Sequence, residues 1–453
     1  MLCHLLIIKL HGVRKMLRYI KLKNYRSFTD LSFDMTGKNG VPKNLIILYG
    51  ENGVGKTNLV NVFDTLNDTF SSLSLRNMIM SFLENNKDSV ASEKLTSLYN
   101  YLDASRIIKD NKTIDSEDNM SIEVGFCLND KNGTYKIEFD NERIVSERLE
   151  YVLNKNKITF YDIQDNERKV NPQILSNAYA VELMKMADKY WGKHSIMAIL
   201  FNAVDEYTND YIKDTFCEQL RKIICYFQTI STCILRNESS GLNVVRSGSL
   251  LTSFDEGEVD ENDEYKIFHT EKLIDTYFKD AYTDISGVFY RKDKIDNRIK
   301  YSLYFKKKIS GKTVNVRYDA ESRGTRNMIM LLPYFLAAMD NQVVIIDEID
   351  NGIHDILLNA VIKNLSYHIG GQLFMTTHNT MFLAEYSFKD SIYFIVEDLD
   401  GYKEIKSIND FGYRIQQKSN VMANYLDEKF SKSPWNGTNV DFVKLLDIEK
   451  EEV

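Results

Sequence analysis

The strongest constraint on the fold is the stretch GENGVGKT, which runs from Gly50 to Thr57 directly behind the apolar segment 44–49. It fits the pattern GxxxxGK[ST], in which a Gly-rich loop joins a buried strand to a helix and turns backbone N–H groups towards phosphate oxygens. A Gly-rich turn that binds nothing is the alternative interpretation. Because the stretch lies between a strand-like and a helix-like segment, we expect a phosphate loop in a parallel α/β sheet.

This loop predicts specific roles. Lys56 is expected to reach the β- and γ-phosphates of a nucleotide, and Thr57 is expected to hold Mg²⁺. The predicted cofactors are therefore ATP and Mg²⁺. The candidate nucleotide-binding residues of the stretch are Gly50, Glu51, Asn52, Gly53, Val54, Gly55, Lys56, Thr57 and Asn58.

A second buried strand is predicted at VVII (343–346), and it is followed by two acids. Ligands of parallel sheets lie at the carboxyl ends of the strands, where Asp347 would contribute to a magnesium site. Glu348 would act as the general base towards an attacking water. A strand end with two solvated acids is the alternative, which the phosphate loop in the same chain disfavours.

A third strand, QLFMTT, ends at His378. A neutral imidazole can donate a hydrogen bond to a γ-phosphate, so we place His378 among the catalytic candidates with Lys56 and Glu348. A lone histidine at a strand end is more often structural. Its position one strand after Asp347 favours the functional interpretation.

The order of predicted elements indicates an α/β fold in which the two ends of the chain form one domain. Residues 1–170 hold the phosphate loop and an antiparallel β meander at 119–163, although residues 1–15 are expected to lie outside the fold. Residues 171–285 are expected to be a mainly helical insertion, helical over 172–236, with an acidic loop at 238–264. Residues 286–453 return to strands and then to alternating helix and strand.

Composition limits the classes of function. The net charge is −8, so the surface as a whole does not attract nucleic acid, although the basic stretch FKKKISGK (305–312) could contact a phosphate backbone. A solvated edge strand is the more ordinary explanation of that stretch. No window approaches the ~20 apolar residues of a membrane span, and the five cysteines show no metal-type spacing, so we expect a cytoplasmic protein.

The ordered motifs NYRSF, GENGVGKT, ESRGTRNM, VVIIDEIDNGIH and FMTTH resemble the ABC-type ATPase heads of the RecF, SMC and OLD-like group. The chain is especially similar to the stand-alone ATPases of bacterial antiphage defence and abortive-infection systems. The resemblance covers 16–60 and 317–430 and is weak between them. It departs from transporter ATPases, because the signature is SRGT and not LSGGQ, and no Q-loop glutamine can be placed.

The resemblance implies a composite site, in which a signature segment on one head caps the γ-phosphate bound by a second head. Ser322, Arg323 and Gly324 match that segment. His354 matches a position in the loop that follows Asp347 and Glu348. Arg414 and Tyr425 match positions around the C-terminal helix, expected at 413–430.

The implied function is an ATP-hydrolysing subunit of a defence complex. A homo-oligomer with at least two heads would control a separate effector, a nuclease or Toprim protein, as in systems of the Septu or PARIS kind. The trigger would be nucleic acid or a phage-derived molecule. Two alternatives remain: a RecF-like DNA-repair ATPase that acts directly on DNA, and a nucleotide-binding scaffold with negligible turnover.

Overall fold

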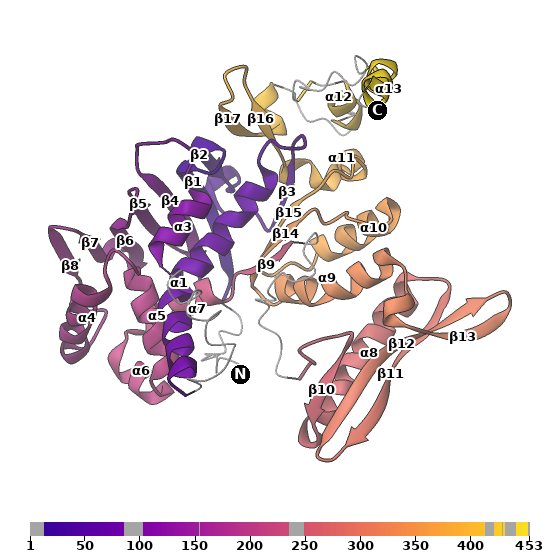
Figure 1. Ribbon diagram of the computed structural model, residues 1–453, viewed down its shortest axis with the longest axis horizontal. Helices are drawn as coiled ribbons and strands as arrows, with labels where there is room; N and C mark the ends of the chain where they lie inside the picture. Colours follow the sequence, from indigo (N-terminus) through magenta and orange to yellow (C-terminus); the bar gives the residue numbers. More distant parts are fainter. Residues whose placement is uncertain are drawn as a thin grey trace.

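The computed structural model describes residues 13–85, 103–153, 155–234, 249–412, 421–427, 429–430 and 441–451. Figure 1 shows a central sheet with one lobe on each side of it: a meander and helices at the left, and the helices α8–α10 with a further sheet at the right. Segments from both ends of the chain meet in the central sheet. The predicted α/β class with an antiparallel meander is confirmed.

The central sheet has six strands in the order β17-β16-β3-β15-β14-β9, and its strands are parallel except for β17. The strands β3, β14 and β15 are buried at every position, as expected of strands covered on both faces. The bounds are β3 Leu45–Tyr49, β9 Ser231–Ile234, β14 Val343–Asp347, β15 Gln372–Thr376, β16 Ile392–Glu397 and β17 Lys403–Ser407.

The two faces of this sheet belong to two different cores. Ile46, Leu48 and Ile345 pack in one core with α1 (Lys56–Asn85) and the meander. Residues between them in sequence, such as Ile47 and Ile346, pack in the other core with the helices α9 Arg323–Met339, α10 Asp355–Ser366 and α11 Met381–Ala384. This alternation follows from the period of two along a strand.

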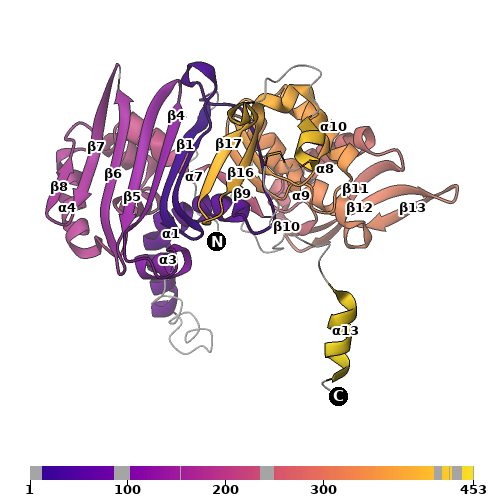
Figure 2. The ribbon, with the colours of Figure 1, turned by 90° about the horizontal axis from the view of Figure 1, so that it is seen from above.

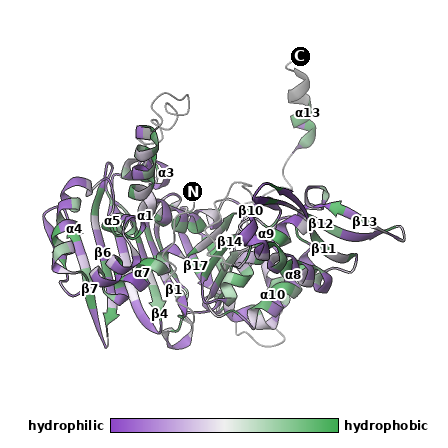
Figure 3. Cartoon of the chain, turned by 90° about the horizontal axis from the view of Figure 1, so that it is seen from below, coloured by the Kyte–Doolittle hydropathy of each residue, from purple (hydrophilic) through white to green (hydrophobic). Residues whose placement is uncertain are grey.

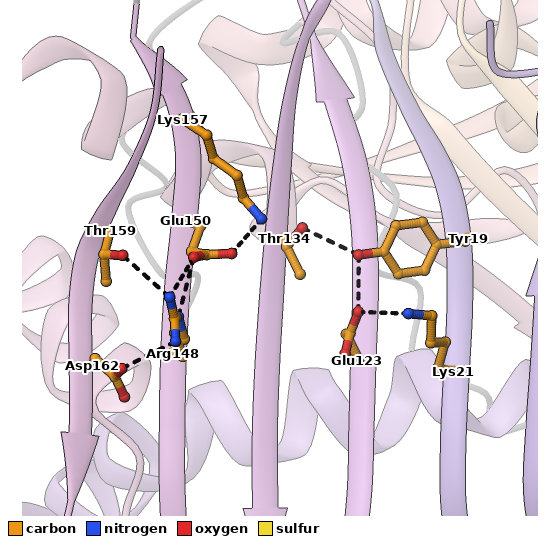
Figure 4. Close-up of polar contacts among 9 residues, drawn as sticks. All are labelled: Tyr19, Lys21, Glu123, Thr134, Arg148, Glu150, Lys157, Thr159 and Asp162. Carbon is orange, nitrogen blue, oxygen red and sulfur yellow. Dashed lines mark hydrogen bonds and ion pairs between the residues drawn. The ribbon is translucent and has the colours of Figure 1, made fainter. Parts of the chain in front are cut away.

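The meander is a seven-stranded antiparallel sheet in the order β2-β1-β4-β5-β6-β7-β8. One face packs in the core, while the other is polar (Figure 4): Lys21 lies 3.3 Å from Glu123, and Arg148 lies 2.6 Å from Glu150. Several cations of this face are therefore paired with acids. The bounds are β1 Lys15–Tyr25, β2 Phe28–Asp34, β4 Met120–Leu128, β5 Lys131–Phe139, β6 Ile144–Leu153, β7 Asn156–Gln164 and β8 Glu167–Val170.

A buried glutamine joins the two sheets. The Gln372 side-chain oxygen accepts from Leu17 N at 2.8 Å, and its amide nitrogen donates to Leu17 O at 3.1 Å and Lys43 O at 2.8 Å. These bonds satisfy backbone groups where the meander meets the parallel sheet, so they fix the first strand of the chain beside β15.

A block of helices covers the inner face of the meander. It contains α3 Ala104–Asn111, α4 Asn177–Tyr190, α5 Ile196–Glu206, α6 Asn209–Thr215 and α7 Glu218–Gln228. The fully buried carboxylate of Glu147, on β6, accepts hydrogen bonds from Ile196 N and Met197 N at the start of α5 and from the hydroxyls of Tyr135 and Tyr161. This buried acid fixes α5 against the sheet.

A four-stranded sheet forms the opposite end of the molecule from the meander (Figure 2). Its strands are β10 Glu256–Asp260, β11 Ile285–Ile295, β12 Arg298–Ile309 and β13 Lys312–Arg317. The helix α8 (Glu264–Ala281) covers one face, where Ile267, Ile274 and Phe278 meet the buried residues of β11 and β12. Both Figure 1 and Figure 2 show the β12–β13 hairpin projecting from the body.

Three expectations need correction. Residues 231–234, expected to be helical, form β9 at the edge of the central sheet, and part of the expected acidic loop, 256–260, is the strand β10 paired with β12. The fold includes Lys15, because β1 begins there, and residues 1–12 lie outside the described residues.

The C-terminal part is described only in pieces. Of the helix expected at 413–430, the described part is α12 (Val421–Leu426), and Arg414 lies outside the described residues. Tyr425 packs on Tyr49 and Phe394, with ring centroids 5.7 and 5.8 Å apart. A last helix, α13, spans Phe442–Glu451. Among the described helices, none has the length and apolar character needed to cross a bilayer.

Candidate functional site

The predicted phosphate loop connects β3, which ends at Tyr49, to α1, which begins at Lys56. Gly53 and Gly55 have φ angles of +84° and +115°, which side chains rarely tolerate. A Cβ atom on Gly55 would also lie 2.9 Å from the Phe28 ring and 3.0 Å from Ser27 Oγ. Both the backbone conformation and the close approach of the β1–β2 turn therefore require glycine at position 55.

Lys56 is 5% exposed, and its ammonium group donates to Gly50 O at 2.6 Å and to Glu51 O at 3.0 Å. The charge is thus held against carbonyl oxygens of the loop itself. Phosphate oxygens are stronger acceptors for an ammonium than backbone carbonyls, because the bond joins two ionised groups. The residue is placed where a phosphate bound in the loop would replace those contacts.

Thr57, Asp347 and Thr376 form a hydroxyl–carboxylate network across three elements, in which Asp347 and Thr376 are buried and Thr57 is half-buried. Thr57 Oγ1 donates to Asp347 Oδ2 at 2.8 Å, and Thr376 Oγ1 donates to Asp347 Oδ1 at 2.6 Å. Asp347 is 1% exposed, so each carboxylate oxygen depends on these donors. The network ties the first turn of α1 to the ends of β14 and β15.

The oxygens of this network fit a magnesium ion shared with phosphates. Mg²⁺ takes oxygen ligands, keeps several waters and is held by one or two protein groups together with substrate phosphates. Thr57 and Asp347 supply a hydroxyl and a carboxylate beside the phosphate loop. Among the described residues, no group of three or more His, Cys, Asp or Glu side chains could form a separate protein-only metal site.

Glu348 follows Asp347 in a left-handed conformation, with a φ of +49°. A non-glycine residue there is strained by about 1 kcal/mol or more, and such strain is often found at functional sites. The Glu348 N–H donates to Thr376 Oγ1 at 2.8 Å, which retains the conformation. The chain thus turns sharply at the end of β14, and the Glu348 side chain is only half-buried.

His378 lies just beyond the end of β15 and is exposed. Its backbone N–H donates to the Asp350 carboxylate at 3.2 and 3.4 Å. The structure therefore brings His378 to the same edge of the sheet as Asp347 and Glu348, because β14 and β15 are parallel neighbours. Its backbone is fixed by the loop that follows Glu348.

The signature segment, Ser322 to Gly324, is more exposed than Lys56 and Asp347. Ser322 is exposed, and its hydroxyl caps α9 by accepting from Thr325 N at 3.2 Å. A Cβ atom on Gly324 would lie 2.6 Å from Gly352 O, so α9 begins in close contact with the loop after β14. Among the described residues, no hydrogen bond or ion pair joins Ser322, Arg323 or Gly324 to the phosphate loop.

The loop between β14 and α10 holds the remaining predicted residue. Asn327 Nδ2, on α9, donates to Asn351 O at 2.6 Å, and Gly352 has a φ of +72°. His354 is the N-cap of α10, where its Nδ1 accepts from Ile356 N at 3.3 Å. The predicted position of His354 therefore has a structural role in starting that helix.

Three contributors were not predicted. Ser27 Oγ accepts from Asn58 Nδ2 at 2.8 Å, so the β1–β2 turn supports the start of α1. Thr376 bridges Asp347 and Glu348, and Asp350 fixes the backbone of His378. The motifs NYRSF, TTH and DEID contained these residues, but their roles depend on strands that only the fold brings together.

A pocket of about 1030 Å³ adjoins the phosphate loop. Glu51, Asn52 and Val54 form one side, and the β16–β17 hairpin forms another, including Tyr402 and Lys403. This volume is sufficient for a small ligand such as a nucleoside group. The position beside Glu51, Asn52 and Val54 is compatible with a nucleotide whose phosphates lie in the loop.

Residues 237–384 match a protein-family model described as "AAA domain, putative AbiEii toxin, Type IV TA system". The matched part is roughly a third of the chain and includes Ser322, Asp347 and His378, but not the phosphate loop. The match supports an ATPase of the AAA/ABC type. No curated protein sequence matches the chain significantly.

Two solved structures similar to this chain are Smc heads. An Smc head bound to the C-terminal winged-helix domain of ScpA is 12% identical, with 87% of this chain and 98% of that chain covered and a TM-score of 0.42. An Smc head with an extended coiled coil, bound to the C-terminal domain of ScpA from Pyrococcus furiosus, is 12% identical, with 87% and 96% covered and a TM-score of 0.38. These scores are low, and the fold assignment rests on the sheet topology.

Proposed function

We propose that this chain is the ATP-binding and hydrolysing subunit of a bacterial antiphage defence complex. Two copies would pair so that each phosphate loop is completed by the signature segment of the other copy. The observation that carries this proposal is that Thr57, Asp347 and Thr376 are hydrogen-bonded to one another, whereas the hydroxyl of the exposed Ser322 bonds within the start of α9. The abortive-infection toxin named in the family description supports the biological setting.

In this proposal, Lys56 binds the β- and γ-phosphates, and Thr57 and Asp347 hold Mg²⁺. Bound magnesium would neutralise charge that develops on the transferred phosphate. Glu348 accepts a proton from the attacking water, and His378 donates a hydrogen bond to the γ-phosphate. The loop residues Gly50–Asn58 supply the remaining contacts to phosphate.

The signature half completes the site from the other copy. Ser322 would donate its hydroxyl to the γ-phosphate, with the start of α9 adding its positive end. Arg323, exposed beside it, would add a positive charge. ATP would then favour the paired state, because it contacts both copies only when they are joined.

The partner would be a separate effector, with a nuclease or Toprim protein of the kind in Septu or PARIS systems as the nearest analogy. We also propose the division into 1–170, 171–285 and 286–453 as the working domain boundaries. The segment 171–285 contributes β9 to the central sheet, so it would not fold as an independent unit.

Phosphate release by the wild type and by Glu348→Gln tests the activity. We expect release to fall by at least ~100-fold in the variant, because general-base catalysis contributes that order of rate. Glu385→Gln is the matched control, since Glu385 forms a surface ion pair with Lys363 at 2.8 Å, away from the loop. Equal release near background by all three proteins would leave only a nucleotide-binding scaffold.

The mass of the Glu348→Gln protein with ATP and Mg²⁺ tests the pairing. We expect a dimer or a larger multiple that dissociates when ATP is removed, because the variant retains ATP in the closed state. A strict monomer at every ATP concentration would refute the composite site.

A further inference from the structure

The outward face of the β11–β12–β13 sheet carries a stacked pair of aromatic rings beside three exposed cations. We propose that this face binds single-stranded nucleic acid, at a site separate from the ATP site. The cationic–aromatic face is defined by Phe289, Arg291, Tyr304, Lys306 and Lys308. The inference does not depend on the proposed ATPase activity.

Strand register places these five side chains on one face. Phe289 is paired directly with Tyr304, and Lys306 and Lys308 follow Tyr304 at intervals of two along β12. The opposite face of the same strands carries Val288, Leu303 and Phe305, which are buried beneath α8. The cationic–aromatic face is therefore turned to solvent, with Arg291, Lys306 and Lys308 exposed.

The two aromatic rings form a small stacked platform. The centroids of Phe289 and Tyr304 are 5.7 Å apart, and the planes are tilted by 25°. Arg291 lies over the Tyr304 ring at 4.6 Å, and Lys306 lies over the Phe289 ring at 5.1 Å. Unpaired bases stack on aromatic rings and on guanidinium planes, while the phosphates between them need nearby cations.

Arg291, Lys306 and Lys308 differ from two other cations on this side of the sheet, because Arg298 and Arg317 are paired with acids. In the part of the chain that the structure describes, no carboxylate lies within ion-pair distance of Arg291, Lys306 or Lys308. The cross-strand partners of Lys306 are Gly287 and Asn315, and that of Lys308 on β13 is Thr313. Glu256 also lies on this side of the sheet, opposite Ser302, but it is paired with Arg317 at 2.8 Å.

The outer face of the meander provides the contrast within the same molecule (Figure 4). There Lys21, Lys136 and Lys157 each form an ion pair with a glutamate, so the cations are already neutralised. A solvated edge strand needs exposed lysines to prevent aggregation, but it does not need a stacked pair of aromatic rings beneath them. The combination of stacked rings and unpaired cations indicates a ligand that carries both bases and phosphates.

The stacked rings favour a single strand over a duplex. The β12–β13 hairpin projects from the body, and Figure 3 shows hydrophilic and hydrophobic residues mixed along these strands. A duplex hides its bases in the stack and would contact only the lysines. A single strand would use the rings as well, so the platform predicts a preference for unpaired nucleic acid.

The test is fluorescence anisotropy with labelled 20-nucleotide single-stranded DNA and RNA of mixed sequence, and with the matching duplex, at several salt concentrations. We expect the wild type to bind single strands at least ~10-fold more tightly than the duplex. In the R291Q/K306Q/K308Q variant, the negative slope of log affinity against log salt should become shallower by about 2. Each lost phosphate contact on a single strand removes about 0.7 from the steepness of the slope.

The matched control is K21Q/K136Q/K157Q, which removes three lysines from the paired face of the meander and should bind like the wild type. A second variant, F289L/Y304L, keeps the cations and removes the rings. Its affinity for single strands should fall by ~10-fold or more, with ATP binding and the thermal unfolding midpoint as checks of folding.

Several outcomes would overturn the proposal. Wild-type binding no tighter than that of R291Q/K306Q/K308Q would remove the site. Equal affinity for single strand and duplex, or an unchanged affinity of a folded F289L/Y304L, would leave only a general phosphate-binding surface. If poly-glutamate displaced the oligonucleotide at equal charge concentration, the face would be one for an acidic protein.

Discussion

The two halves of the proposed composite site are held by the chain in opposite ways. On the phosphate-loop half, Lys56 and Asp347 are 5% and 1% exposed, and each has its hydrogen-bond partners within the chain. On the signature half, Ser322 and Arg323 are exposed, and what is fixed is the backbone beneath them, through Gly324 and Gly352. One half holds Lys56 and Asp347 in hydrogen bonds within the chain, whereas the other presents groups outward.

This difference in burial and hydrogen bonding indicates which functions each half can have alone. The phosphate-loop half has the buried charge and the oriented hydroxyls to bind a nucleotide in a single chain. The signature half has no such surroundings, so it can contribute only when a second surface approaches it. Substitutions in the first half should therefore affect binding, and those in the second should affect turnover with binding retained.

Lys56→Ala should give the largest effect. Loss of the ammonium group removes charge-assisted hydrogen bonds to two phosphates, each worth about 1.5–3 kcal/mol, so ATP affinity should fall on the order of 100-fold. Equilibrium binding of a fluorescent ATP analogue measures this. Lys363→Ala, which removes a surface lysine of α10, should leave the affinity unchanged. An equal affinity of Lys56→Ala and the wild type would show that the loop does not bind phosphate.

Gly324→Ala should disturb the signature half while nucleotide binding by the phosphate loop is retained. The added Cβ would lie 2.6 Å from Gly352 O, a backbone atom, so the loop after β14 must move away from the start of α9. We expect ATP hydrolysis to fall by ~10-fold or more, with ATP affinity within twofold of the wild type. Gly37→Ala is the control, because its Cβ would meet no atom nearer than 3.7 Å. A parallel loss of affinity in Gly324→Ala would contradict the independence of the halves.

The contrast between the halves also shows what can be predicted from sequence. The strands β3, β14 and β15 contain the apolar runs LIILY, VVII and LFM, and the motif residues Lys56, Asp347 and His378 follow these runs, so both the strands and the candidate residues were predictable. β10 was missed because its acidic, exposed residues owe their strand conformation to pairing with β12. β9 was missed because four residues after a helix carry too little pattern.

Long-range partners set the limit of such prediction. Thr376 contacts Asp347 across 29 residues, and Gln372 contacts Leu17 across 355 residues. Glu147 accepts from a helix start 49 residues later. A threonine, glutamine or glutamate in a strand is ordinary in sequence, and its role follows only from the neighbour that the fold supplies.

Ser322→Ala should have a smaller effect than Gly324→Ala. It removes the proposed γ-phosphate hydroxyl and also the cap of α9, and a lost cap costs about 1 kcal/mol of stability. Ser176→Ala separates these two consequences, because Ser176 caps α4 by accepting from Tyr179 N at 3.4 Å. Both variants should lose similar stability in thermal unfolding, whereas only Ser322→Ala should lose turnover, by roughly fivefold. Equal turnover in both would reduce Ser322 to a helix cap.

Lys307→Gln tests whether the signature half depends on the sheet that carries the cationic–aromatic face. Lys307 lies between Lys306 and Lys308 but on the other face, and its ammonium group is 3.1 Å from Glu321, the residue before Ser322. Loss of this ion pair should loosen Ser322 and lower turnover by two- to threefold, as measured by phosphate release. Lys300→Gln, on the same strand, is the control. If both variants matched the wild type, the position of Ser322 would not depend on this sheet.

Glu147→Gln should leave turnover unchanged and so serve as the baseline for effects of stability alone. Burial raises the pKa of Glu147 to about 7, although its four hydrogen-bond donors oppose the shift. The folded state therefore holds a proton that the unfolded state releases above its ordinary pKa of 4.5. Stability should be highest below pH 4.5 and decrease as the pH rises to about 7, by about 3 kcal/mol from this group.

Urea unfolding of the wild type and Glu147→Gln at several pH values between 5 and 8 measures the contribution of Glu147 to the free energy of unfolding. The uncharged amide does not titrate, so the difference in unfolding free energy between the two proteins should shift towards the variant as the pH rises. A pH-independent difference would mean that Glu147 is ionised in the folded protein throughout this range. In either case, turnover that changed with this substitution would show that the meander core and the ATP site are coupled, against the separation argued from Lys56 and Ser322.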